Sequence, residues 1–214
     1  MDEELSIISS NNRNERVKNF LRENQKKLIS FLIIIILILI GFFGYGELRD
    51  RKQIQISNEY NSIIIDFNDD NKEITSKKLI NLINKKDPTY SPLSLYFIID
   101  NNLVADNEKI NKLFNILIDE TSLKKEIKYL VILKKALFNA DRYNEGELLN
   151  TLNPLINSES VWRSHALHLI AEFFYSKDEK QKAKEFFNQI VSLENANPDI
   201  KLQAQKRLNR DLSE

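Results

Sequence analysis

The stretch that decides the architecture is LISFLIIIILILIGFFGYG, which occupies residues 28–46. It holds 19 residues without a charged side chain, and fourteen of them are Ile, Leu or Phe. A helix rises about 1.5 Å per residue, so a run of this length nearly matches the roughly 30 Å hydrocarbon core of a bilayer. At about −0.3 to −0.6 kcal/mol each, the fourteen apolar residues give roughly −4 to −8 kcal/mol for insertion. The sequence therefore predicts one transmembrane helix over 28–46.

Two other structures compete with this interpretation. A buried core helix is one, but apolar side chains on every face are rare in a core helix of such length. A cleaved signal peptide is the other, and its apolar region spans about 7–15 residues before a small-x-small site. The present run is longer, and Gly44-Tyr45-Gly46 matches such a site poorly. A retained span is therefore favoured.

Cations flank the apolar run unequally. Residues 13–27 hold six Lys or Arg side chains, whereas residues 47–61 hold three. Because Lys and Arg beside a span tend to stay in the cytoplasm, this bias predicts a cytoplasmic N-terminus and an exported remainder. Residues 1–12 are expected to be a disordered tail and residues 15–27 a short amphipathic lead-in helix. The predicted parts are a cytoplasmic tail and lead-in helix over 1–27, a transmembrane helix over 28–46 and an exported helical domain over 47–214.

The composition excludes several functional classes. The chain has 31 Lys+Arg and 31 Asp+Glu, and its net charge of zero gives no global field for binding nucleic acid. It has no Cys, which excludes disulfide scaffolds, zinc–cysteine sites and thiol catalysis. Four Gly and four Pro with 29% charged residues indicate an all-α chain without phosphate-binding glycine loops. No catalytic constellation, cofactor or metal site is predicted, and the protein is expected not to be an enzyme.

Apolar positions at helical spacing continue beyond the span. Residues 47–67 are expected to extend the membrane helix until the polar segment NDDN (68–71) breaks it. A second helix is expected up to residues 86–88 (KDP), and a third from Ser91 and Pro92. Further helices are expected at about 107–120, 123–140, 143–157, 161–176, 179–194 and 198–212.

The last two long helices carry small and aromatic residues at the spacing of a helical hairpin. This set resembles the tetratricopeptide signature, whose period is about 34 residues, and comprises Leu167, Ala171, Phe174, Ala183 and Phe187. Counterparts about 35 residues earlier are Ile132, Ala136, Leu148, Leu152 and Leu155. The sequence thus predicts a single N-terminal transmembrane helix followed by a tetratricopeptide-like helical-hairpin array, with an irregular helical bundle as the alternative.

In such an array, the first helix of each hairpin faces an inner curve, and concave faces of this kind bind peptides. The candidate partner-binding face consists of His165, His168, Glu172 and Tyr175 in the last hairpin and of Leu130, Leu133 and Leu137 one repeat earlier. Two repeats earlier the equivalent residues are Leu95, Ile98, Asn102 and Ala105. This apolar face is either an open groove or is covered by the 47–67 helix. Trp162 is either a packing residue or a partner anchor.

Two side-chain patterns have a plainer interpretation. The residues His165, His168 and Glu172 share a helical face and are chemically suitable ligands, but they lack an HExxH arrangement and a ligand from another segment. No metal site is therefore predicted there. The pairs Lys124-Lys125 and Lys134-Lys135 are interpreted as solvated helix faces rather than as an RNA-binding patch.

Two segments carry a resemblance to a known family. The segment VKNFLRENQKKL (17–28) runs directly into the span, and Trp162 is followed by Ala171-Glu172 and by SKDEKQKA (176–183). These segments are similar to the cytoplasmic helix and to the final helical hairpin of the YfgM family of bacterial inner-membrane proteins. The resemblance extends over most of the chain, although the middle matches only in its pattern of apolar residues.

The resemblance implies an ancillary subunit of the Sec translocon that lies beside a SecYEG-type channel, with its helical domain in the periplasm. It also implies association with a PpiD-type periplasmic chaperone, and exported polypeptide is a further candidate partner. No catalytic residue is carried over, because the family has none that is accepted. The expected function is that of an interaction module anchored in the inner membrane and acting in protein export. The alternative is a scaffold for cell-envelope assembly or division unrelated to secretion.

Overall fold

The computed structural model describes residues 18–212 of the chain. Every regular element in this range is a helix, which confirms the all-α prediction. The tail expected over 1–12 and the first three residues of the lead-in helix expected over 15–27 lie outside the described residues. The chain divides into two compact units, Met1–Gln55 and Ile56–Glu214.

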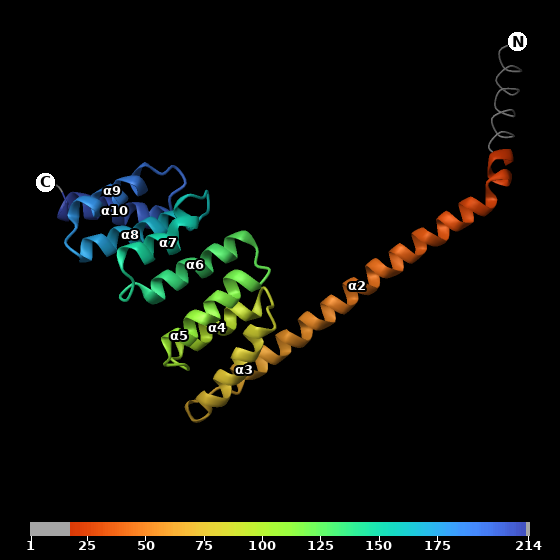
Figure 1. Ribbon diagram of the computed structural model, residues 1–214, viewed down its shortest axis with the longest axis horizontal. Helices are drawn as coiled ribbons and strands as arrows, with labels where there is room; N and C mark the ends of the chain where they lie inside the picture. The colour runs from red at the N-terminus through yellow and green to blue at the C-terminus, as the bar shows by residue number, and fades with distance from the viewer. Residues whose placement is uncertain (1–17, 213–214) are drawn as a thin grey trace, which may run out of the picture. The chain divides into compact units, whose positions relative to one another are not determined.

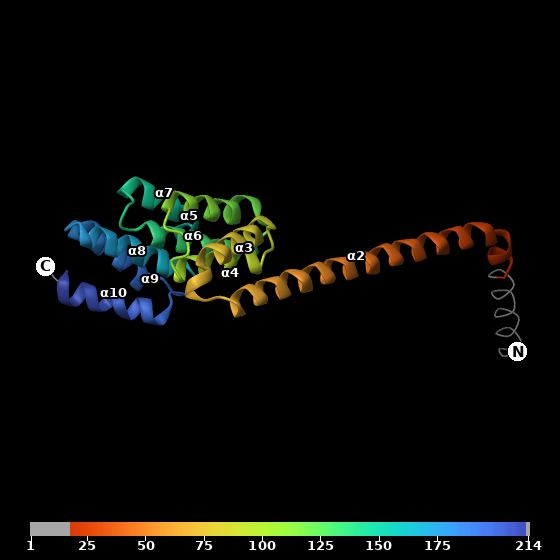
Figure 2. The same cartoon turned by 90° about the horizontal axis from the view of Figure 1, so that it is seen from below.

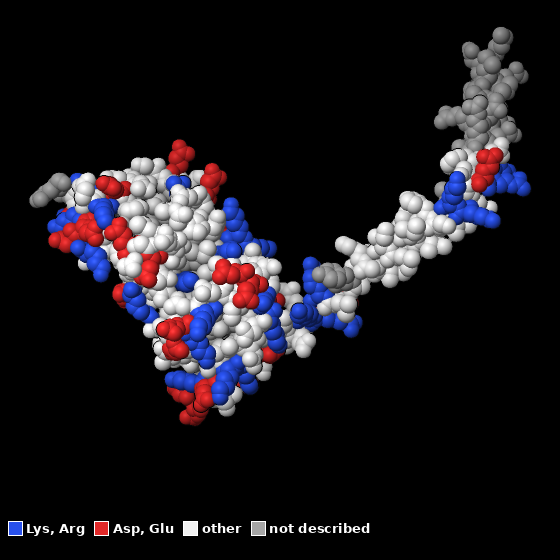
Figure 3. Space-filling view, in the orientation of Figure 1, with Lys and Arg blue, Asp and Glu red and all other residues white. Residues whose placement is uncertain are grey.

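The first unit is dominated by helix α2 (Gln25–Ile65), which follows a short helical segment at residues 18–23 and continues into the second unit. Its apolar stretch is long enough to cross a membrane, and none of that stretch is buried. Every side chain over residues 29–44 is exposed. Figure 3 shows the stretch as uncharged surface with Lys and Arg at both of its ends. A helix that exposes apolar side chains on all sides is unlike a soluble core helix, so α2 is a candidate membrane span.

The second unit contains the end of α2 and the helices that follow it (Figures 1 and 2). In chain order these are η1 (Asp69–Asn71), α3 (Lys72–Asn84), α4 (Tyr90–Asp100), α5 (Asn107–Asn115), η2 (Ile116–Glu120), α6 (Lys125–Asn139), α7 (Glu145–Ile156), α8 (Arg163–Ser176), α9 (Lys180–Ser192) and α10 (Pro198–Asp211). The boundaries lie within a few residues of those expected from the sequence. One difference is the helix expected over 107–120, which is α helical only to Asn115 and then becomes the π-helical turn η2.

Side-chain caps explain where several of these helices begin. Asp106 accepts hydrogen bonds from two backbone N–H groups of α5, at 2.9 and 3.2 Å. Asn144 and Glu147 form a reciprocal capping box at the start of α7, with both hydrogen bonds at 2.9 Å. Asn197 caps α10 immediately before Pro198, which needs no N–H partner in the first turn. Each cap satisfies N–H groups that lack a partner within their own helix.

Two hydrophobic clusters form the interior of the second unit. The first cluster consists of the buried residues Ile56, Ile63, Leu79, Leu82, Ile83, Leu95, Ile98, Ile110, Leu113, Phe114, Leu117 and Val131. The second cluster consists of Ile132, Leu133, Ala136, Leu148, Leu152, Leu155, Ala166, Leu167, Ile170, Ala171, Phe173, Phe174, Ala183, Phe187, Ile190, Ala204 and Leu212. Helix α6 contributes to both, because Val131 belongs to the first cluster and its neighbour Ile132 to the second.

The end of α2 packs on the hairpin formed by α3 and α4. Ile56 and Ile63 of α2 are buried in the first cluster together with Leu95 and Ile98 of α4. The hydroxyl of Tyr90 on α4 lies 2.7 Å from the hydroxyl of Ser57 on α2. The last turns of α2 therefore cover part of the apolar face that the sequence assigns to this hairpin.

The residues that resemble the tetratricopeptide signature lie together in the second cluster. Those buried on α8 and α9 are Leu167, Ala171, Phe174, Ala183 and Phe187, and their counterparts on α6 and α7 are buried in the same cluster. Helices α8 and α9 pack against each other, as α6 does against α7. Small and aromatic residues thus hold consecutive helices together, an arrangement that a repeat array and an irregular bundle both use.

The π-helical turn η2 lets consecutive apolar side chains reach both hydrophobic clusters. Leu117 is buried in the first cluster, whereas Ile118 packs against both clusters. The turn ends where the Thr121 hydroxyl donates a hydrogen bond to the Ile116 carbonyl at 3.0 Å. A π turn holds one residue more than the equivalent α turn, which changes the direction in which successive side chains point.

Candidate functional site

The candidate face on α8 is covered by the C-terminal helix α10. Arg207 of α10 forms two hydrogen bonds with the Glu172 carboxylate, at 2.9 and 2.8 Å. Its guanidinium also lies 4.6 Å from the centre of the Tyr175 ring and 3.0 Å from Asp211 Oδ2. Planar pairing with a carboxylate and stacking on an aromatic ring are both typical of arginine. At this hairpin, the cover is therefore α10 and not residues 56–65 of α2.

The two histidines of this face pack against neighbouring aromatic rings and are not available as an exposed surface for a partner. His165 lies against the Trp162 ring, with centroids 5.4 Å apart, and His168 lies against the Phe187 ring at 5.9 Å. His165 Nδ1 and His168 Nε2 are buried and form no hydrogen bond among the described residues. The nearest acid, Glu172, has its Oε1 atom 3.7 Å from His168 Nε2. The described residues contain no group of three or more His, Cys, Asp or Glu side chains that is arranged to hold a metal ion.

Burial favours the neutral form of both histidines. It lowers the pKa of His165, against a smaller opposing effect from the nearby Val161 backbone. It also lowers the pKa of His168, where Glu172 acts in the opposite direction and Arg207 and His165 lower the pKa further. Burial disfavours a charged imidazole because the charge would lose its hydration.

Trp162 joins α8 to α6. Its indole Nε1–H donates to the backbone carbonyl of Glu126 at 3.1 Å, and its ring packs against the second cluster. Ser160, two residues earlier, donates to the Glu126 carboxylate at 2.6 Å. These contacts agree with the packing interpretation of Trp162 and leave its indole N–H engaged within the chain.

The candidate face on α6 is only partly available. Leu133 is buried in the second cluster and Leu130 is half-buried, whereas 52% of Leu137 is exposed. Leu137 lies at the rim of a pocket of about 170 Å³, hereafter the α4–α6 pocket. The residues lining this pocket are Tyr96, Ile99 and Asp100 of α4, Phe114 of α5, and Lys134, Leu137 and Phe138 of α6.

The α4–α6 pocket combines an apolar lining with a few polar groups. Lys134 Nζ lies 4.6 Å from the centre of the Tyr96 ring, a cation–π contact. The Tyr96 hydroxyl is buried and has no hydrogen-bond partner among the described residues. Burial raises the pKa of Tyr96 to about 12, so the hydroxyl keeps its proton and remains a donor. A buried donor without a partner costs free energy that an incoming acceptor would recover.

The size of the α4–α6 pocket limits what it holds. Pockets for drug-sized ligands and cofactors measure about 300–1,000 Å³, whereas this one measures 170 Å³. It therefore suits one side chain of a polypeptide better than a cofactor. A segment that places an apolar side chain against Leu137 and an acceptor near Tyr96 or Lys134 would satisfy the lining.

Sequence reasoning identified Leu137 but missed the other residues of the α4–α6 pocket. Lys134 and Lys135 were expected on a solvated helix face, yet both are half-buried. Lys134 lies over Tyr96, and Lys135 donates to the Asn115 side chain at 2.8 Å. A signal was present in the sequence, since Lys134 precedes Leu137 by three residues and shares its helical face.

The chain matches no protein-family model, no curated protein and no solved structure. Over residues 18–212, the fold and these surfaces define an all-helical protein with one candidate membrane span and a partly open apolar pocket.

Proposed function

We propose that this protein is a non-enzymatic interaction module anchored in the bacterial inner membrane and ancillary to the Sec translocon and its periplasmic chaperones. The observation that carries the proposal is the apolar stretch of α2, which is exposed on every side and is followed by a packed helical unit. An anchored module needs only weak contacts, because tethering in one membrane raises the effective concentration of its partners. The YfgM resemblance supplies the candidate partners, a SecYEG-type channel and a PpiD-type chaperone.

The proposed topology has the N-terminus in the cytoplasm and residues 47–214 in the periplasm. Six cations lie in residues 13–27 before the apolar stretch, and three lie in residues 47–61 after it. Such a bias favours this orientation. Because the chain has no Cys, a single introduced cysteine is a unique label. Ser192→Cys is expected to react with a membrane-impermeant maleimide in spheroplasts, and Asn19→Cys only after lysis. The reverse pattern would refute the topology.

The α4–α6 pocket is the proposed contact point for a partner polypeptide. Leu137 offers exposed apolar surface, and Tyr96 and Lys134 offer donors beside it. An apolar anchor flanked by backbone carbonyls fits this lining, which holds Lys134 and Asp100 as its charged groups. The candidate face on α8 is a weaker contact point, since Glu172 and Tyr175 are already in contact with Arg207.

Site-specific photocrosslinking in intact cells tests the proposed function. A crosslinking amino acid at Ile36 in the apolar stretch is expected to capture a translocon subunit. The same residue at Leu137 is expected to capture the chaperone or exported polypeptide. Leu202 on α10 is the matched control, because it is a leucine of similar exposure, 49% against 52%, outside the pocket.

The outcome also separates the two candidate functions. Adducts with translocon or chaperone subunits from Ile36 and Leu137, and not from Leu202, support the export proposal. Adducts with envelope-assembly or division proteins instead favour the scaffold alternative. Equal capture from Leu137 and Leu202 removes the α4–α6 pocket as the contact point.

A further inference from the structure

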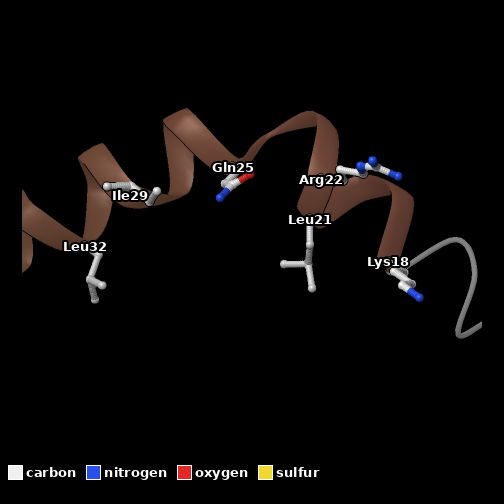
Figure 4. Close-up of a pocket in the computed structure, with 6 residues that line it drawn as sticks. All are labelled: Lys18, Leu21, Arg22, Gln25, Ile29 and Leu32. Atoms are coloured by element: carbon white, nitrogen blue, oxygen red, sulfur yellow. The ribbon is translucent and has the colours of Figure 1, made fainter.

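A notch opens within the first unit, where the chain bends before α2. The helical segment 18–23 ends at Asn24, whose backbone N–H and side-chain amide both donate to the Phe20 carbonyl at 3.0 Å. Helix α2 then begins at Gln25. The concavity between the two has a volume of about 550 Å³ and is hereafter the N-terminal notch. Its lining residues, shown in Figure 4, are Lys18, Leu21, Arg22, Gln25, Ile29 and Leu32.

The lining of the notch has cationic side chains at one end and aliphatic side chains at the other. The cations Lys18 and Arg22 come from the segment before the bend, whereas Ile29 and Leu32 come from the first turns of α2 (Figure 4). Leu21 lies between them and is 50% exposed. A surface with positive charge at one end and exposed aliphatic side chains at the other matches a ligand with an anionic head and an apolar tail.

We propose that the N-terminal notch binds one anionic phospholipid, with Lys18 and Arg22 on the phosphate and Leu21, Ile29 and Leu32 along the acyl chain. Charge favours this occupant, because residues 18–27 hold four cations and one acid, Glu23. Position favours it as well, since Ile29 and Leu32 belong to the exposed apolar stretch that the proposed function places in the bilayer. The inference rests on that anchoring but not on the identity of the protein partners.

The lysines nearest to the notch provide a matched comparison. Lys26 and Lys27 lie on the same side of the apolar stretch as Lys18 and Arg22, but they line a separate concavity of α2 together with Ser30, Phe31 and Ile34. If only the general positive charge of the flank attracted anionic lipid, then the two pairs would contribute equally. If the notch selects the lipid, then Lys18 and Arg22 contribute most of the selectivity.

The experiment compares phospholipids bound to the full chain. The protein is reconstituted into vesicles of phosphatidylcholine and phosphatidylglycerol at 3:1 and re-extracted in mild detergent, and bound lipid is measured by mass spectrometry. Wild type is expected to enrich phosphatidylglycerol over its bulk share. The double variant Lys18→Gln, Arg22→Gln is expected to show at most about a third of this enrichment, because cations near a membrane surface attract anionic lipid. Lys26→Gln, Lys27→Gln is expected to retain most of it.

Three results would overturn the proposal. They are no enrichment in wild type, retained enrichment in Lys18→Gln, Arg22→Gln, and an equal loss in both double variants. Vesicle flotation distinguishes this failure from failure of the anchoring: a protein that floats with vesicles but shows no selectivity refutes only the notch. A protein that does not float refutes both. Leu21→Gln keeps every cation and is expected to lower the total lipid retained, which tests the apolar half.

Discussion

The hairpin of α8 and α9 and the α4–α6 pocket belong to the same helical unit, but the first is covered by α10 whereas the second is partly exposed. On α8, Glu172 and Tyr175 are both in contact with Arg207 from α10. At the pocket, Leu137 is exposed and the Tyr96 hydroxyl has no partner among the described residues. The difference teaches that the polar groups of one face, here on α8, can be paired within the protein. A face that the sequence shows as apolar, here on α6, can instead adjoin a hydroxyl donor that has no partner.

The largest expected effect concerns the core beneath the covered face. Phe187→Ala removes a fully buried ring that contacts His168 and is expected to cost about 3–5 kcal/mol of unfolding free energy. Urea denaturation of the full chain in detergent measures it. Val161→Ala, at a position 65% exposed, is the control and is expected to stay within about 0.5 kcal/mol of wild type. A small effect of Phe187→Ala would mean that this hairpin is not closely packed.

The next effect tests whether Arg207 closes the terminal face. Arg207→Met removes the paired hydrogen bonds to Glu172 and the stacking on Tyr175, and is expected to cost about 1–2 kcal/mol. Arg210→Met is the matched control, because Arg210 also pairs with Asp211 but is largely exposed. Its loss is expected to leave the unfolding free energy essentially unchanged, because exposed ion pairs contribute little. If Arg207→Met costs as little as Arg210→Met, then the contacts of Arg207 do not hold α10 in place.

A substitution in the α4–α6 pocket is expected to leave the unfolding free energy unchanged or to raise it, unlike the two changes above. Tyr96→Phe removes a buried hydroxyl without a partner and is expected to leave stability unchanged or to raise it by about 0.5–1 kcal/mol. The same change is expected to reduce partner crosslinking from Leu137, because the donor is lost. Thermal unfolding and crosslinking yield are measured on one preparation. A loss of stability above about 1 kcal/mol would indicate that the hydroxyl is already satisfied.

The smallest effect is a pH dependence confined to the covered face, since both histidines of the chain lie on α8. Their pKa values in the folded protein are lowered from 6.5, mainly by burial. Below pH 6.5 the unfolded chain therefore binds more protons than the folded protein, and stability falls as the pH drops. The loss between pH 7.5 and pH 5.5 is expected to diminish in the double variant His165→Gln, His168→Gln. An unchanged slope would assign the pH dependence to other groups.

Much of the fold could be predicted because local rules determine it. The uncharged run over 28–46 identifies α2, and the tetratricopeptide-like residues of α8 and α9 are buried together as helical periodicity requires. The cover on α8 could not be predicted, because Glu172 and Arg207 are 35 residues apart and meet only through tertiary packing. The α4–α6 pocket was missed for the same reason, since Tyr96 and Lys134 come from separate helices.

The π-helical turn at Ile116–Glu120 has a consequence for how this chain tolerates changes in length. It is wound one residue wider than an α turn, so deleting one residue there converts it to ordinary winding. A deletion within α8 or α9 would instead rotate every later side chain by about 100° away from its core. The turn is thus a position between the two hydrophobic clusters where the chain can lose one residue without such a rotation.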